Sequence, residues 1–155
     1  MECSTKTLAR VAIIASSYLL LGFSFQSLSF GPIQVRMSDV LYPMIAVFGY
    51  PMLVGTFLGH LFFNIYGYVS GLALGVLDLF SPFIFLVPKY AILKWKLKAV
   101  PLHVIFVAFW VAYMLRSMYG LPFWISVLTV GLGEATAEII LGVPLAIAVR
   151  RRIRK

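Results

Sequence analysis

Five polar side chains interrupt long apolar stretches of this chain, and their types suit the recognition of a polar solute. They are Arg36, Asp39, Asn64, Asp78 and Glu134. Ionisable groups inside a bilayer are costly, so such residues are candidate functional residues. We expect Arg36 and Asp39 in an outer loop, Asn64 near an outer helix end, Asp78 two turns into its helix and Glu134 near the midplane. All five can then converge on one outward-facing cavity. An alternative is that Arg36 and Asp39 only pair with each other at the headgroup level.

Three further titratable residues have weaker claims to a functional role. Glu138 lies one helical turn beyond Glu134 on the same face, where it can support the site or remain protonated. His60 shares a helix face with Asn64, but a lone buried imidazole is more often a packing and hydrogen-bonding residue. We expect His103 near the inner surface, without a chemical role.

Enzyme signatures are missing from the sequence. There is no H-x-x-x-H or H-E-x-x-H pair for a metal, no P-loop, and no Ser, His and Asp set at a plausible depth. The single cysteine, Cys3, cannot form an internal disulfide. We therefore expect no metal, no cofactor and no catalysis. A small integral membrane enzyme that acts on a lipid or isoprenoid stays the alternative of a different class.

The composition indicates an integral membrane protein rather than a soluble domain or a nucleic-acid binder. Of the 155 residues, 62% are hydrophobic and 12% are charged, whereas soluble domains average roughly 45–50% apolar and about 25% charged residues. The net charge of +8 is gathered in short clusters between long apolar stretches. That distribution is typical of the loops of a multi-pass membrane protein.

The apolar stretches predict an all-α membrane protein with a single domain, residues 1–155, and six transmembrane helices. A helix needs about 20 apolar residues to cross the hydrocarbon. The stretch 37–66 is broken at Gly49 and Pro51, a turn signal, so it gives one short helix and one longer helix. We expect the last helix to be tilted or bent near Pro144. The predicted helices cover residues 8–28, 37–48, 51–66, 72–89, 101–118 and 121–149.

The basic residues predict the orientation. Six crossings with both termini in the cytoplasm place 11 of the 13 Lys and Arg residues inside, and they leave only Arg36 and Arg116 outside. In this assignment Lys89 belongs to an inner cluster with the lysines at 94, 96 and 98. Five crossings would put that cluster and the C-terminal arginines outside, which the positive-inside rule disfavours.

Pairs of small residues at a spacing of four recur along the chain. They are Ala12/Ser16, Gly55/Gly59, Gly71/Gly75 and Ala108/Ala112. Each pair puts two small residues on one helix face, which lets backbones approach closely in lipid. Packing within the chain accounts for most such pairs.

Motifs near both ends of the chain resemble the QueT family. The segment FGPIQVRMSD at 30–39 resembles that family's G-P-I-Q-F-R-I-S-E-A loop, and FW at 123–124, VGLGE at 130–134 and LGVPL at 141–145 resemble its last helix. The spacing of Gly55, Gly59 and Asn64 is also similar. Two departures are Asp39, where the family usually has Glu, and Ser16, where Ala is usual.

The resemblance implies a substrate-binding (S) component of an energy-coupling factor (ECF) transporter, in a prokaryotic cell membrane. Such a component has six helices and binds a queuosine precursor, a 7-deazaguanine. Its partners would be a transmembrane coupling protein and two cytoplasmic ABC-type ATPases. Ala12 and Ser16 match the pair that faces the coupling protein.

The implied ligand also fits the chemistry of the candidate residues. A guanine-like edge offers adjacent N–H donors, and one carboxylate can accept two of them in parallel. Glu134 is the main candidate for that carboxylate, and Tyr42 or Trp124 could stack on the flat ring. An S component for another flat, vitamin-like solute is the alternative within transport.

Overall fold

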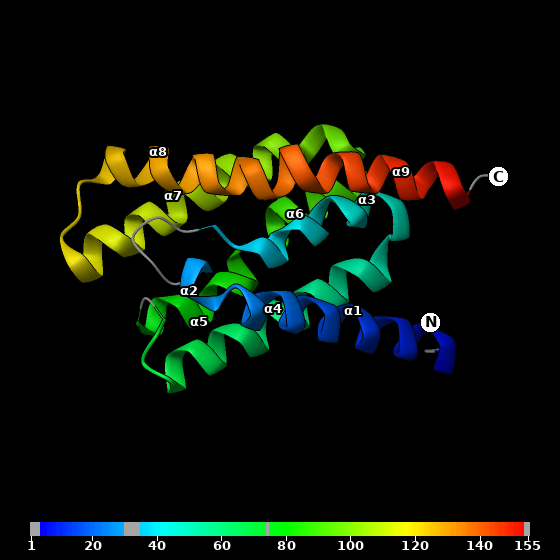
Figure 1. Cartoon of the computed structure of the whole chain (residues 1–155), viewed down its shortest axis with the longest axis horizontal. Coiled ribbons are helices and arrows are strands. Elements are labelled where there is room, and N and C mark those ends of the chain that lie inside the picture. Colours follow the sequence, from blue (N-terminus) through cyan, green and yellow to red (C-terminus); the bar gives the residue numbers. More distant parts are fainter. Residues whose placement is uncertain (1–3, 30–34, 74, 154–155) are drawn as a thin grey trace.

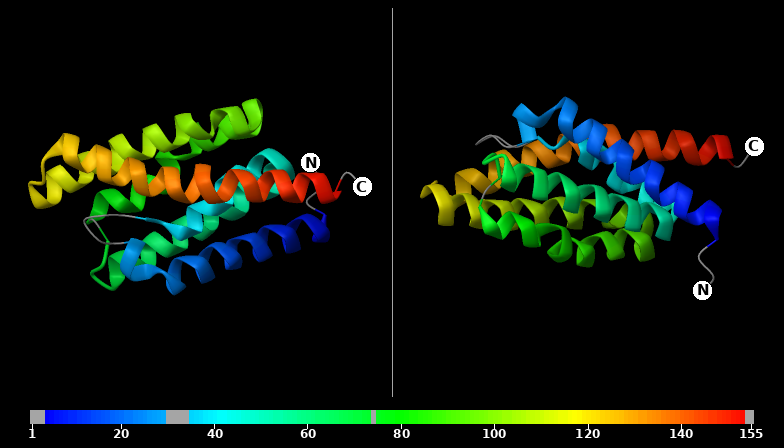
Figure 2. Two further views of the ribbon diagram at one scale, coloured as in Figure 1. Left: turned by 45° about the horizontal axis from the view of Figure 1, so that its top comes forward. Right: turned by 90° about the horizontal axis from the view of Figure 1, so that it is seen from below.

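Helices form the described part of the protein. The computed structural model describes residues 4–29, 35–73 and 75–153, and this part of the chain contains no β-strand. The helices pack lengthwise as a bundle, and the chain begins and ends at the same end of it (Figures 1 and 2). In chain order the elements are α1 (Thr5–Ser24), α2 (Gln26–Ser29), η1 (Met37–Met44), α3 (Ile45–Phe48), α4 (Tyr50–Val69), α5 (Val76–Ile84), α6 (Leu86–Trp95), η2 (Lys96–Ala99), α7 (Val100–Tyr119), α8 (Phe123–Glu134), η3 (Ala135–Gly142) and α9 (Val143–Ile153).

Glycines let α1 and α4 cross at close range. A Cβ atom at Gly55 would lie 2.6 Å from the Ile14 Cβ atom, and a Cβ atom at Gly59 would lie 2.6 Å from the Tyr18 Cβ atom. The carbonyl oxygen of Ala15 would be 3.0 Å from that second Cβ atom. The Gly55/Gly59 pair therefore serves packing within the chain.

We expect Gly59→Ala to force α1 away from α4, because neither a Cβ atom nor a backbone oxygen can swing aside. Overpacking of this kind costs about 1–3 kcal/mol, and each kcal/mol lowers the unfolding midpoint by about 2–4 °C in a chain of this size. A thermal melt in detergent measures the loss. Gly131→Ala is the matched control, because its Cβ atom would meet the Ala108 Cβ atom at an ordinary 3.5 Å. Equal midpoints for the two variants would contradict the expectation.

The short second helix expected at 37–48 is a 3₁₀ segment, η1, followed by one α-helical turn, α3. A 3₁₀-helix rises about 2.0 Å per residue and an α-helix about 1.5 Å, so these elements together reach roughly 22 Å. That length is short of a hydrocarbon core of about 30 Å. The turn after Phe48 uses Gly49 at φ 70°, and Pro51 lies in the first turn of α4.

The helix expected at 72–89 is wrong at both ends. It begins at Val76, breaks at Phe85 between α5 and α6, and continues to Trp95. The expected helix face of Gly71 and Gly75 does not form, because both glycines lie in the preceding turn with φ of 69° and 76°. The later end places Lys89 inside α6, where it is buried, and not in an inner loop.

The helix expected at 121–149 is one continuous run without a break at Pro144 (Figure 1). Between α8 and α9 the segment η3 is a π-helix, and the Val143 N–H group donates to the Glu138 carbonyl oxygen. Proline removes one N–H donor and clashes with a carbonyl in an ordinary α-helix. The wider winding directly before Pro144 coincides with the place where we expected a bend.

The protein is an all-α membrane protein. By length and apolar composition, four helical runs in the described residues can cross a bilayer, and Met37–Phe48 is a shorter apolar helix. One of the four, Val76–Tyr119, has 44 residues, enough for two crossings. Lys96, with a φ of 59°, marks the turn within that run. Six crossings stay a prediction.

Candidate functional site

A buried polar cluster fills the middle of the bundle. Its charged and titratable members have between 0% and 3% of their surface exposed, although they come from segments far apart in sequence. The cluster contains all four acidic residues in the described ranges. Its main members are Tyr18, Arg36, Asp39, Tyr42, His60, Asn64, Asp78, Lys89, His103, Glu134 and Glu138.

Three of the predicted site residues meet directly. The Arg36 guanidinium donates to the Asp78 carboxylate at 3.4 Å and lies 2.6 Å from Nε2 of His60. The Asn64 amide donates to Asp78 through two contacts, at 2.7 Å to its carbonyl oxygen and 3.0 Å to its carboxylate. Asp78 lies in the first turn of α5 rather than two turns in, because the helix begins later than expected. Arg36 is buried, and its ion pair is with Asp78 rather than with Asp39.

A chain of hydrogen bonds connects Arg36 to Asp39 through three rings. The Tyr18 hydroxyl donates to the Asp39 carboxylate at 2.6 Å, and the two tyrosine hydroxyls are 2.9 Å apart. The Tyr42 hydroxyl lies 3.0 Å from Nδ1 of His60. One arrangement is consistent along this chain of hydrogen bonds: His60 accepts from Arg36 at Nε2 and donates from Nδ1 to Tyr42, and Tyr42 donates to Tyr18. A neutral His60 therefore joins the arginine to the carboxylate.

Lys89 is the functional candidate that sequence reasoning missed. Its Nζ atom lies 4.1 Å from the centre of the Tyr42 ring and 3.4 Å from Nδ1 of His60. A cation over an aromatic face gains electrostatic energy, most of all when it is desolvated. The signal in the sequence was the four uncharged residues that separate Lys89 from Lys94.

His103 and Glu138 form a second buried pair. Nδ1 of His103 lies 2.7 Å from Oε1 of Glu138, and both side chains are fully buried. His103 lies in the first turn of α7 and is buried inside the bundle. Its place near the inner surface of the membrane and its lack of a chemical role stay predictions. For Glu138 the sequence left open a supporting role or a protonated state, and the structure shows that it contacts His103.

Several acceptor oxygens in the cluster have no partner within the described residues. They are Oε2 of Glu134, Oδ2 of Asp39, Oε2 of Glu138 and Oδ1 of Asn64. Asp39 lies on η1, which packs against η3, the segment that directly follows Glu134. Buried polar atoms are normally satisfied, so unsatisfied acceptors in one place suit a molecule that brings N–H donors.

The charges of the cluster also favour a ligand that brings hydrogen-bond donors. Four carboxyl groups face two cations, Arg36 and Lys89, inside the described bundle. A buried carboxylate without a cation needs a proton, a hydrogen-bond donor or a ligand. The described residues contain no group of three His, Cys, Asp or Glu side chains that could hold a metal ion. The site thus has acceptors to spare for a polar organic solute.

The two aromatic residues that we expect could stack on the ligand, Tyr42 and Trp124, lie in different places. Tyr42 is fully buried in the cluster, whereas Trp124 is 68% exposed and contacts Phe109 and Phe123 on the outside of the bundle. Trp124 is therefore not part of the site. The buried rings near the cluster are Tyr18, Tyr42 and Phe85.

The cluster is closed to solvent in this structure, since each of its charged side chains is buried. We expected a cavity that opens outward. The motif residues 30–34, which precede Arg36, lie outside the described residues, as do Cys3 and the last two basic residues. Ala12 and Ser16 are exposed on α1, away from the Gly55/Gly59 contact.

Comparison with known proteins agrees with the motifs. The family model of the QueT transporter matches residues 8–151, nearly the whole chain. No match was found among curated proteins or solved structures. The matched range contains every residue of the buried cluster and both motif regions. The chain therefore belongs to the QueT transporter family.

Proposed function

We propose that this chain is the substrate-binding component of an ECF-type importer and that it captures a 7-deazaguanine, a queuosine precursor. The observation that carries the proposal is that two buried carboxyl groups, Asp39 and Glu134, each have an oxygen that lacks a partner, and that η1 and the last helical run, which carry them, pack together. Two acceptors of this kind match the adjacent N–H donors of a guanine-like edge. Charge-assisted bonds in parallel are among the strongest that a polar solute can make.

The neighbours of the carboxyl pair support the same ligand. The ring of Tyr42 lies in the cluster, with Lys89 over it and Tyr18 stacked beside it, so stacking on a flat bicycle requires one of these neighbours to move. The unpartnered oxygen of Asn64 offers one more acceptor beside Asp78. Asp78 is already bonded by Arg36 and Asn64, so we assign it a supporting role in the site.

A binding panel tests this proposal. Calorimetric titration of the purified protein should give micromolar or tighter affinity for a 7-deazaguanine and no measurable heat for 7-deazaadenine, which lacks the paired donors. The panel should include 7-deazaguanines with and without a basic amine. A difference in their affinities reports whether a carboxyl group of the cluster binds the amine. Tight binding of a flat vitamin, with no response to any deazaguanine, would support the alternative S component and contradict the ligand.

The transport part of the proposal needs partners, which we infer to be a transmembrane coupling protein and two cytoplasmic ABC-type ATPases. Uptake of labelled ligand should require all of them. Chemical conversion of a lipid or of the ligand by the purified chain alone would instead favour a membrane enzyme.

We assign the coupling interface to Ala12 and Ser16, which are exposed on α1. Small residues let a partner helix approach closely in lipid. Replacing both with Leu should abolish uptake and leave ligand binding unchanged. The control is Ser117→Leu with Thr136→Leu, two exposed small residues on α7 and η3. Normal uptake by the first double variant would exclude this face.

We further propose that both termini and η2 face the cytoplasm, which follows from the positive-inside rule. In a Cys3→Ser background, a cysteine at Tyr119 should react with an impermeant maleimide on intact cells. A cysteine at Lys98 should react only after the cells are permeabilised. Both positions are exposed: Tyr119 is the last residue of α7, and Lys98 lies in η2, just before α7 begins. The reverse pattern would invert the topology.

A further inference from the structure

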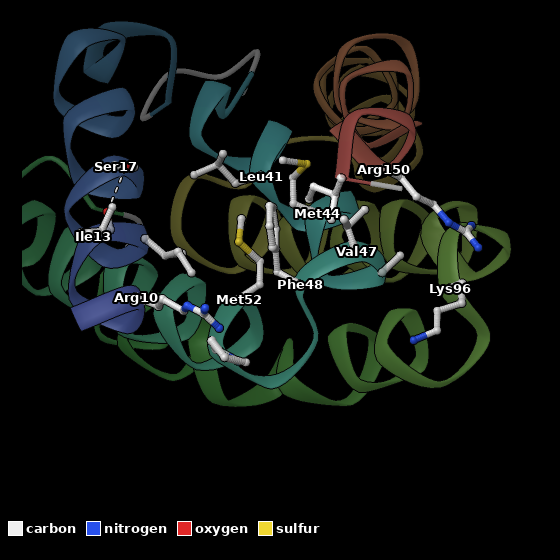
Figure 3. A pocket seen from close by; sticks show the side chains of 14 residues that line it. Arg10, Ile13, Ser17, Leu41, Met44, Val47, Phe48, Met52, Lys96 and Arg150 are labelled. Carbon is white, nitrogen blue, oxygen red and sulfur yellow. Dashed lines mark hydrogen bonds between the residues drawn. The ribbon is translucent and has the colours of Figure 1, made fainter. Parts of the chain in front are cut away.

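A groove lies on the outside of the bundle at the end that carries the termini. It has a volume of about 820 Å³ and lies between α1, the α3–α4 turn and α9. This volume is within the range of ligand sites, roughly 300–1,000 Å³. Figure 3 shows Met44, Phe48 and Met52 in its centre, with Arg10 on one side and Arg150 with Lys96 on the other.

Three cations border this groove, and no acidic residue lines it. The acidic residues of the described chain, Asp39, Asp78, Glu134 and Glu138, are all buried in the central cluster. The ion pairs found among the described residues use only members of that cluster. Arg10, Lys96 and Arg150 are exposed. No ion pair among the described residues uses their charge, so it can attract an anion.

The groove is also amphipathic along its length. Arg10 and Ser17 both line it from α1, seven residues apart, which is about 10 Å along the helix axis. Leu41 and Met44 continue the apolar lining from η1. The cations thus lie at the end of the bundle, and the apolar part runs toward the membrane interior.

We propose that this groove binds an anionic phospholipid, with the phosphate at Arg10, Lys96 and Arg150 and an acyl chain along the apolar lining. Basic pockets between transmembrane helices bind anionic headgroups. In the orientation proposed above, the groove lies at the cytoplasmic end of the bundle, where anionic headgroups are available. The inference does not depend on which solute the buried cluster carries.

Native mass spectrometry of the full chain tests the proposal with two phospholipids, phosphatidylglycerol and phosphatidylcholine. The natural sequence should retain one phosphatidylglycerol, with at least a tenfold preference over phosphatidylcholine. The triple variant Arg10→Gln, Lys96→Gln, Arg150→Gln should lose that preference. The matched control, Lys94→Gln, Arg151→Gln, Arg152→Gln, removes the same charge from exposed positions outside the groove and should keep it.

Two further measurements keep the test decisive. Ser17→Trp fills the groove without a change in charge and should reduce lipid retention. If the triple variant does not fold, single substitutions of Arg10, Lys96 and Arg150 should each lower the preference for phosphatidylglycerol. Equal loss in both triple variants would reduce the effect to net surface charge and overturn the proposal. If the groove triple variant keeps its lipid but loses the coupling protein in a pull-down, the groove is a protein interface and the proposal is wrong.

Discussion

Glu134→Gln is expected to weaken binding of a 7-deazaguanine about ten- to a hundredfold. The substitution keeps the size of the side chain but replaces an acceptor oxygen with an NH₂ donor. That donor would confront the donors of the ligand beside Asp39. A buried donor left unsatisfied costs about 1–3 kcal/mol, and more when its partner was charged, and each 1.4 kcal/mol is tenfold in affinity. Calorimetric titration of the folded variant gives the number.

Glu138→Gln is the matched control for this experiment. It makes the same chemical change four residues along the chain, at a carboxyl group whose Oε1 atom already bonds His103. Its Oε2 atom also lacks a partner, but the proposal places the ligand donors at Asp39 and Glu134, so we expect a change of less than a few fold. If Glu134 were only a protonated acid in the packing, Gln would substitute for it without loss. An unchanged affinity in Glu134→Gln would remove this residue from the site.

Arg36→Ala is expected to lower both stability and binding. The guanidinium bonds Asp78 and His60, and all three side chains are buried. Removing one partner of a buried ion pair costs about 3–5 kcal/mol, because the remaining charge is uncompensated. The unfolding midpoint in detergent and the ligand affinity measure the two losses. Arg116→Ala is the control, since Arg116 is exposed near the end of α7.

A double variant separates the two losses. Asp78→Asn in the Arg36→Ala background removes the uncompensated carboxylate, so it should recover most of the lost stability. Ligand affinity should stay low if Arg36 also orients His60 and the tyrosines for binding. Full recovery of both quantities would mean that Arg36 serves only to neutralise Asp78. Equal effects of Arg36→Ala and Arg116→Ala would contradict a role for Arg36 in binding and in the stability of the cluster.

Several members of the buried cluster could be predicted because polar residues are rare in the apolar stretches of this chain. Arg36, Asn64 and Asp78 were singled out by the cost of burying polar groups in a bilayer, and they contact one another. Their role in ligand binding stays a prediction. Lys89 was missed for a physical reason: a lysine near other lysines looks like a loop residue until the helix end is known. The end at Trp95, beyond the expected 89, is what buries Lys89.

The departures from α-helical winding could not be read from the sequence. Whether a helix winds as 3₁₀, α or π depends on what packs against it, since the hydrogen-bond energies differ little. In this protein Gly142 of η3 lies against η1: a Cβ atom there would be 2.7 Å from the Val40 carbonyl oxygen. The two irregular segments therefore pack on each other, a contact of high sequence separation that periodicity does not report.

The buried cluster has a consequence for how the chain enters the membrane. Its paired groups are far apart in sequence: 42 residues separate Arg36 from Asp78, and 35 separate His103 from Glu138. In synthesis from the N-terminus, each early group reaches the bilayer before its partner exists. An unpaired charge at a helix centre costs about 2.5–3.5 kcal/mol on insertion scales. The early segments therefore need to stay in contact with the insertion machinery until their partners are made. The last helical run carries Glu134 and Glu138 and completes the set of buried charges, so the bundle can leave the insertion machinery only after this run is synthesised.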